Sequence, residues 1–279
     1  MTAISTDRAG DGASPAAAPP GLVFLTGCGR SGTTILGTIL SQRPDVSYLN
    51  DRFRLWTDVF LAGDIWGMNP ESRQARVALG ASDVTDSGRA AVFARLEKAR
   101  AGKAIVLEKL AINNFRLPFL RALAPSARFI NIIRHGVEVA RSIARKVEAG
   151  EWYGVDDRKW PLLCEHAEAR GLGDLAASCR TPYERGLLEW RMSVEAAAPV
   201  VEELGGRQLI QVTYAELIDF PDQVIARIER FLRLPHDETA AAWAATNVRR
   251  LNPAADEAPA PESTDRIAGA TLRRFGYTW

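Results

Sequence analysis

The chain has few of the side chains that build disulfide frameworks or metal centres: its 279 residues include 3 cysteines and 3 histidines. Cys28, Cys164 and Cys179 form an odd, widely spaced set, which favours free thiols in a reducing cytoplasm. No two histidines have the helical spacing of metal ligands with an acid between them. The sequence therefore predicts no metal site, and Cys28 is interpreted as a small residue in a tight turn rather than a nucleophile.

The chain also lacks long apolar runs and an excess of charge of one sign. No stretch approaches the roughly 20 apolar residues that span a bilayer, and the N-terminus does not resemble a signal peptide. The formal net charge is +1, so overall charge gives no reason to expect nucleic acid or an anionic membrane as a partner. We expect a cytoplasmic protein in which any anion site is local.

What the chain does contain is enough apolar sequence for a large core, because 47% of its residues are hydrophobic. Residues 1–20 combine glycines, prolines and six alanines, a composition that cannot supply a core face. The expected organisation is therefore a disordered leader over residues 1–20 and one α/β domain over residues 21–279.

Strand-like and helical patterns alternate through that domain. Apolar runs with strand character cover residues 22–26, 104–107, 128–133 and 209–213, and helical patterns lie between them. Such alternation predicts three layers, with a central, mainly parallel sheet flanked by helices on both faces. Ligands of such sheets bind beyond the carboxyl ends of the strands.

The connecting segments are expected as follows. A helix covers residues 33–42, a short extended piece follows it at 45–48, and residues 55–100 have a helical, partly amphipathic pattern. Asn113 or Asn114 is a candidate cap of the helix after the second strand. A long helix is expected over 183–203, and Pro221 is expected to open another. Residues 150–180 are expected to form an irregular, acceptor-side loop or lid.

The first strand runs into a glycine-rich turn. Gly27 and Gly32 enclose four residues, as in a P-loop, and Thr33 and Thr34 follow where an NTPase carries Lys and then Ser or Thr. Glycines let the loop turn its N–H groups inward, and the next helix adds its positive end, so the loop can hold a phosphate. Because Arg30 is the only fixed cation in the loop, its preferred ligand is expected to differ from ATP.

Two motifs together resemble one family. Residues 27–34 resemble the 5′-phosphosulfate loop of sulfotransferases that use 3′-phosphoadenosine 5′-phosphosulfate (PAPS), in which Arg-Ser-Gly-Thr-Thr opens the first helix. Residues 129–142 resemble the family's 3′-phosphate segment, where a strand-ending Arg, here Arg134, is followed eight residues later by a Ser, here Ser142. The resemblance covers residues 21–279 and points to the branch that contains bacterial and protein-tyrosine sulfotransferases, whose shorter motifs resemble residues 43–46, 212–217, 231–235 and 275–277.

This resemblance implies PAPS as co-substrate, adenosine 3′,5′-bisphosphate as product, and no metal. It implies that the loop binds the 5′-phosphate, that Arg134 and Ser142 bind the 3′-phosphate, and that Tyr214 lies near the adenosine or simply anchors its own helix. The implied nucleotide-binding residues are Gly29, Arg30, Ser31, Gly32, Thr33, Thr34, Arg134, Ser142 and Tyr214.

The candidate catalytic residues implied by the resemblance are Asp51, Lys109 and Arg30. In the protein-tyrosine branch a Glu lies 21 residues after the loop Arg and serves as base, and here that position is Asp51. The alternative interpretation of Asp51 is a cap of a helix that begins near residue 53, and His135 and His166 are weaker candidates for the base. The chain also departs from the family by having Gly29 where Pro is usual and by lacking the Pro that commonly follows Lys109.

The acceptor is expected to be a small or medium molecule with a hydroxyl or phenol: a secondary metabolite, lipid, sugar or tyrosyl peptide. Six aromatic residues either line an apolar pocket for it or pack in the core: Trp56, Phe60, Trp66, Trp152, Tyr153 and Trp160. Two other functions remain open, a P-loop kinase that uses ATP and a catalytically inactive nucleotide-binding protein. The sequence does not set the oligomeric state.

Overall fold

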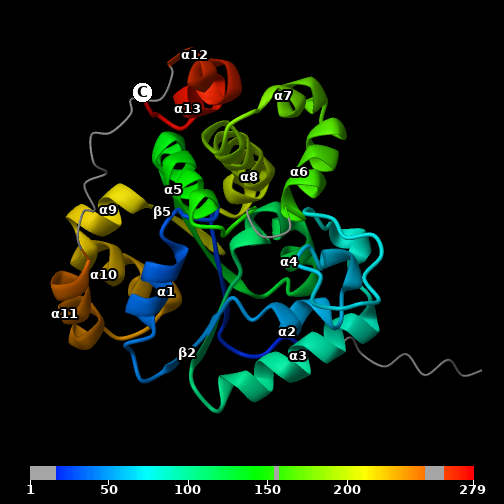
Figure 1. The fold of residues 1–279 in the computed structure, drawn as a ribbon. Helices are drawn as coiled ribbons and strands as arrows, with labels where there is room; N and C mark the ends of the chain where they lie inside the picture. The colour runs from blue at the N-terminus through cyan, green and yellow to red at the C-terminus, as the bar shows by residue number, and fades with distance from the viewer. Residues whose placement is uncertain (1–16, 154–156, 249–260) are drawn as a thin grey trace, which may run out of the picture.

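The five strands of the protein form one sheet in a computed structural model that describes residues 17–153, 157–248 and 261–279 (Figure 1). The strands are β1 (Leu22–Thr26), β2 (Val46–Asn50), β3 (Ile105–Lys109), β4 (Arg128–Ile133) and β5 (Leu209–Thr213). Their order is β2-β3-β1-β4-β5, and all four pairings are parallel. The predicted α/β fold with a parallel sheet is confirmed; most of the expected leader, residues 1–16, lies outside the described residues.

Helices cover both faces of the sheet (Figure 1). They are α1 (Thr33–Leu40), α2 (Phe53–Thr57), α3 (Asp86–Arg100), α4 (Leu117–Leu123), α5 (Gly136–Glu148), α6 (Lys159–Glu168), α7 (Gly173–Ser178), α8 (Pro182–Leu204), α9 (Tyr214–Asp219), α10 (Pro221–Leu232), α11 (Glu238–Asn247), α12 (Pro261–Thr264) and α13 (Ala270–Arg274). A π-helical turn, Asp265–Gly269, joins the last two, and short 3-10 turns occur at Leu61–Gly63, Ala81–Asp83 and Ala111–Arg116.

Alternation along β1 divides the core into two parts. Phe24 points into the larger part, which α3, α4, α5 and α8 cover, whereas Val23 and Leu25 point into the smaller part under α1, α10 and α11. Successive residues of a strand face opposite sides, so a strand that is buried on both faces is apolar throughout. This is why β1 reads as an uninterrupted apolar run and why its C-terminal end is fixed between two packed layers.

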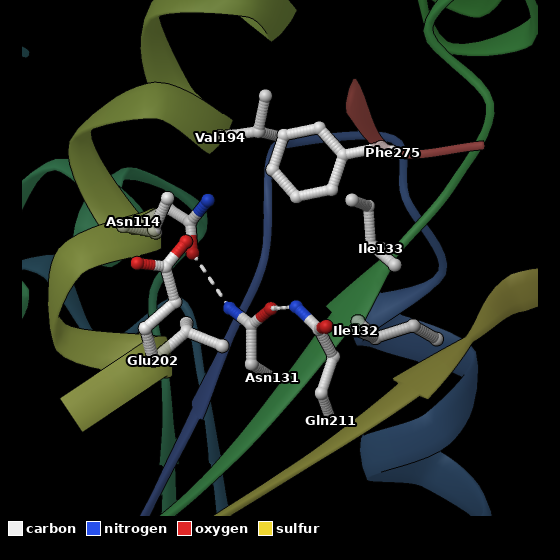
Figure 2. A pocket seen from close by; sticks show the side chains of 11 residues that line it. Asn114, Asn131, Ile132, Ile133, Val194, Glu202, Gln211 and Phe275 are labelled. Carbon is white, nitrogen blue, oxygen red and sulfur yellow. Dashed lines mark hydrogen bonds between the residues drawn. The ribbon is translucent and has the colours of Figure 1, made fainter. Parts of the chain in front are cut away.

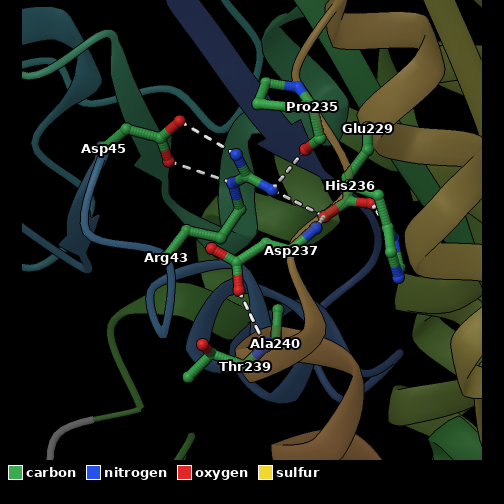
Figure 3. A network of polar contacts seen from close by, with 8 residues as sticks. All are labelled: Arg43, Asp45, Glu229, Pro235, His236, Asp237, Thr239 and Ala240. Carbon is green, nitrogen blue, oxygen red and sulfur yellow. Dashed lines mark hydrogen bonds and ion pairs between the residues drawn. The ribbon is translucent and has the colours of Figure 1, made fainter.

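A buried ion pair fixes the far end of α1 (Figure 3). Arg43 is 2% exposed and donates to Asp45 at 2.9 Å, to Glu229 at 2.6 Å and to the Pro235 carbonyl at 2.9 Å. Glu229 is itself 3% exposed and lies opposite Nδ1 of His236 at 2.9 Å. The network ties the end of α1 to α10 and to the turn before α11, so the helix that follows the glycine-rich loop has a fixed direction.

Several local expectations need correction. The extended piece expected at 45–48 is a full strand, β2, because it pairs with β3. Residues 55–100 are helical only in α2 and α3, with 3-10 turns and irregular chain between them. The expected irregular segment at 150–180 contains α6 and α7, and its residues 154–156 lie outside the described residues. Pro221 does open a helix, as predicted.

The expected cap at Asn113 or Asn114 is also wrong. Both residues are buried within the 3-10 turn after β3, and the helix that follows has Arg116 at its N-cap position. Their amides instead join core networks: Asn113 donates to Glu108 at 2.9 Å, and Asn114 donates to Ser193 at 3.1 Å. A buried amide needs partners wherever it lies, and here the tertiary contacts supply them.

Candidate functional site

The loop between β1 and α1 needs a glycine at the position where it enters the helix. Gly32 has φ +97°, and a Cβ built on it would lie 2.5 Å from the Tyr214 ring. Only glycine meets both conditions, because other residues are strained at this φ and would collide with the ring. The loop therefore reaches α1 in close contact with the first residue of α9.

Ser31 supplies a polar atom without a partner inside this loop. The residue is 1% exposed, and its Oγ has no hydrogen-bond partner within the described ranges. An unsatisfied buried hydroxyl costs about 1–3 kcal/mol. A phosphate oxygen held by the loop would provide the missing partner, so the side chain fits an anionic ligand at this point.

The end of β4 and helix α5 bring further polar groups to the loop. Arg30 Nε donates to Ser142 Oγ at 3.1 Å, and Arg134 Nη1 donates to the Arg30 carbonyl at 3.2 Å. The Arg134 guanidinium lies 4.1 Å from the centroid of the Tyr214 ring, a cation–π contact. Four residues from three distant parts of the sequence thus meet: Arg30, Arg134, Ser142 and Tyr214.

The two arginines repel each other in this arrangement. Burial and the neighbouring Arg134 lower the pKa of Arg30. Glu138 pairs with Arg134 at 2.8 Å and offsets part of the excess positive charge. A polyanion bound between the two guanidinium groups would relieve the repulsion, which is the electrostatic signature of an anion site.

A second group of candidates lies at the ends of β2 and β3. Lys109 Nζ is 2.7 Å from Asp51 Oδ2, and the Asp51 N–H donates to the Lys109 carbonyl at 2.9 Å. The Lys109 side chain is 2% exposed, whereas that of Asp51 is 33% exposed. Asp51 has φ +48°, and Arg52 occupies the cap position of α2, so the alternative interpretation of Asp51 as a helix cap is not supported. The pair leaves a carboxylate at the surface of the strand ends, in contact with a buried ammonium group.

Glu108, which directly precedes Lys109, is a further titratable residue at this strand end. It is fully buried and accepts hydrogen bonds from Trp56 Nε1 at 2.7 Å and Asn113 Nδ2 at 2.9 Å. Burial raises its pKa to about 8, and the charge of Asp51 adds to the rise. A glutamate that directly follows three apolar residues of a buried strand was the signal that could have identified it.

His135 and His236 have hydrogen-bond partners, whereas Nε2 of His166 is buried without one among the described residues. Nδ1 of His135 accepts from the Val137 N–H at 3.2 Å, and its Nε2 lies 2.7 Å from the Thr278 carbonyl, to which it donates in the neutral ring. His166 packs its ring edge-on against Phe115, and burial lowers its pKa. Both nitrogens of His135 are therefore engaged, which makes it a poor base.

Cys28 and most of the aromatic candidates belong to the core. Cys28 is 1% exposed, and burial raises the pKa of its thiol, so it remains protonated. Four of the six aromatic candidates are buried, while Trp66 and Trp152 are half-buried and pack against the larger core. The buried four are Trp56, Phe60, Tyr153 and Trp160. Trp66 and Trp152 are therefore the two of the six that remain candidates for lining an acceptor pocket.

A cavity of about 120 Å³ lies elsewhere, between β4, β5 and α8 beside Phe275 (Figure 2). Asn131 accepts there from Gln211 Nε2 at 2.9 Å and donates to Asn114 Oδ1 at 2.8 Å. The amides thus satisfy one another. None of the candidate phosphate or transfer residues lines this cavity.

The fold and the glycine-rich loop define an α/β protein of P-loop-like architecture. The model of the sulfotransferase family matches residues 20–238, and the chain belongs to that family. Protein-tyrosine sulfotransferase 2 of Gallus gallus is 23% identical over 221 residues, which are 78% of this chain and 52% of that protein. The chain thus spans about half the length of this curated relative.

Solved structures share the fold. The sulfotransferase domain of the curacin biosynthetic pathway has a TM-score of 0.53 at 15% identity and covers 94% of this chain and 99% of its own. The sulfotransferase domain of the Synechococcus PCC 7002 olefin synthase has a TM-score of 0.56 at 18% identity, with 95% and 97% coverage. The sulfotransferase of Alicyclobacillus acidocaldarius has a TM-score of 0.52 at 15% identity, with 94% and 98% coverage.

The described residues contain no group of three or more His, Cys, Asp or Glu side chains that could hold a metal ion. Within the same ranges, no helix combines the length and apolar character needed to cross a membrane.

Proposed function

We propose that the chain transfers a sulfuryl group from PAPS to a hydroxyl or phenol of a small or medium acceptor, such as a secondary metabolite, lipid, sugar or tyrosyl peptide. The observation that carries the proposal is the junction of the glycine-rich loop with the end of β4. There the backbone cradle and Ser31 adjoin Arg30, Arg134 and Ser142. Such a junction suits a nucleotide with phosphates at both its 5′ and 3′ positions better than a triphosphate.

In this proposal the backbone N–H groups of the loop hold the 5′-phosphate, with Arg30, Ser31 and Thr33 as side-chain donors. Arg134 and Ser142 hold the 3′-phosphate. Tyr214, whose ring already contacts Arg134, borders the adenosine. Gly29, Gly32 and Thr34 complete the loop. The domain comprises residues 21–279, and its segment 150–180 borders the acceptor.

The transfer step uses the pair at the ends of β2 and β3. The acceptor oxygen attacks the sulfur as its proton passes to Asp51, and the bond from sulfur to the bridging phosphate oxygen breaks. Lys109, 2.7 Å from Asp51, and Arg30 stabilise the negative charge that develops on the bridging oxygen. Adenosine 3′,5′-bisphosphate leaves. The three free cysteines fit a reducing compartment, and we place the protein in the cytoplasm.

Calorimetric titration with adenosine 3′,5′-bisphosphate tests the donor without knowledge of the acceptor. We expect saturable binding that Arg134→Ala weakens by about 10- to 150-fold, which corresponds to roughly 1.5–3 kcal/mol for a charged hydrogen bond. Arg121→Ala, which removes a surface pair with Glu203, is the matched control. Magnesium-dependent ATP binding without affinity for the bisphosphate would instead establish the kinase alternative.

A further inference from the structure

Gly29, the loop residue before Arg30, packs directly against Trp152. A Cβ built on Gly29 would lie 2.4 Å from Cη2 and 2.7 Å from Cζ2 of the indole. The φ angle of Gly29 is not in the left-handed region, so the backbone conformation does not require glycine. The position therefore needs glycine for space, and the occupant of that space is the Trp152 ring.

The same contact places the indole beside the groups of the transfer step. The Cβ built on Gly29 would also lie 3.7 Å from Cβ of Ala111, two residues after Lys109. The six-membered edge of the indole thus lies where the glycine-rich loop meets the end of β3. In the proposed function this is the acceptor side of the sulfuryl group, beside the loop residue that precedes Arg30.

A buried carboxylate fixes the indole in that position. Glu189 on α8 is 2% exposed and accepts from Trp152 Nε1 at 3.0 Å, from the Tyr153 hydroxyl and from Lys159 Nζ. Lys159 Nζ also lies 4.1 Å from the centroid of the Trp152 ring. Burial and Glu189 raise the pKa of Tyr153, so its hydroxyl remains a donor. A buried charge needs such partners, and their arrangement determines where the indole lies.

We propose that Trp152 forms a wall that keeps water away from the sulfuryl group of the bound donor, with Glu189 as the residue that positions it. This inference rests on the proposed function. Without the wall, water takes the place of the acceptor: its oxygen bonds to sulfur, the bond from sulfur to the phosphate oxygen breaks, and the proton passes to solvent. The products are inorganic sulfate and adenosine 3′,5′-bisphosphate.

The test is hydrolysis of PAPS in the absence of any acceptor. We expect Trp152→Ala to raise the rate of this hydrolysis by about tenfold, because admitting water lowers its activation barrier by about 1.4 kcal/mol. The affinity of the variant for adenosine 3′,5′-bisphosphate should stay within about twofold of that of the unaltered protein. Glu189→Gln is also expected to raise the rate of PAPS hydrolysis. Trp279→Ala is the matched control, since that ring is 40% exposed and contacts Arg273 at the C-terminus.

A double-mutant cycle separates the wall from general damage to the loop. Gly29→Ala is expected to raise hydrolysis by displacing the ring, and to add nothing further when Trp152 is already Ala. Normal bisphosphate binding with unchanged hydrolysis in Trp152→Ala and Gly29→Ala overturns the inference alone. If Trp152→Ala does not fold, the same measurement of PAPS hydrolysis is made on Gly29→Ala and Trp152→Phe, and unchanged hydrolysis in both overturns the inference. Absence of bisphosphate binding by the unaltered protein would contradict the proposed function itself.

Discussion

At the scale of single residues, turnover is expected to depend most on Asp51. Asp51→Asn keeps the size of the side chain but cannot accept the proton, so we expect sulfuryl transfer to fall by about 10²- to 10⁴-fold. Bisphosphate affinity should change little, because Asp51 lies with Lys109 at the other strand ends rather than among the phosphate residues. The effect is measured as the rate at which adenosine 3′,5′-bisphosphate is released in the presence of an acceptor that the unaltered protein sulfates. Unchanged turnover would remove Asp51 as the base.

Glu108 is expected to make stability depend on pH. Burial raises its pKa from 4.5 to about 8, so between these values the folded chain binds more protons than the unfolded chain. Stability therefore falls as pH rises through this window. Because Gln does not titrate, Glu108→Gln should gain stability relative to the unaltered protein as pH rises. Urea unfolding at about pH 5 and about pH 8.5 measures the difference, and parallel pH profiles would contradict the assignment.

At the scale of elements, the buried pair at the end of α1 is expected to contribute more than any surface pair. Arg43→Ala leaves Glu229 charged and buried, and we expect a loss of about 3–5 kcal/mol in the free energy of unfolding. Arg54→Ala is the control: Arg54 is 73% exposed and lies 3.9 Å from Asp58, so its loss should cost about 1 kcal/mol or less. Equal effects of the two substitutions in urea titrations would contradict this assignment.

The elements around the candidate site show which sequence patterns predicted the secondary structure correctly. The first strand, the glycine-rich turn and α1 follow from a buried apolar run, two glycines and a helical pattern that ends before Pro44. In contrast, β2 contains Ser47 and Asn50, so the sequence predicted only a short extended piece there, and it is a full strand because β3 pairs with it. Tertiary pairing here overrides weak local preference.

At the scale of the whole molecule, nucleotide binding is expected to stabilise the fold, because the proposed ligand joins β1, β4, α5 and α9. A ligand at 100 times its Kd adds about 2.7 kcal/mol, which for a domain of this size corresponds to a rise in Tm of roughly 5 to 10 °C. Thermal melts with and without adenosine 3′,5′-bisphosphate measure the shift. Arg134→Ala should lose most of it, whereas Arg121→Ala should retain it; equal shifts in both variants would place the ligand elsewhere.

The sequence by itself determined the α/β class and the glycine-rich loop, because these depend on local patterns, and its resemblance to the sulfotransferase family implied the residues proposed to hold the nucleotide. Only the tertiary structure decided which side chains meet. Arg30 reaches Ser142 across 112 positions of sequence, and Lys109 reaches Asp51 across 58. Glu189 likewise meets Trp152 only in the folded chain, across 37 positions of sequence. Such contacts depend on strand order and on helix packing, and the periodicity of a single segment carries no information about either.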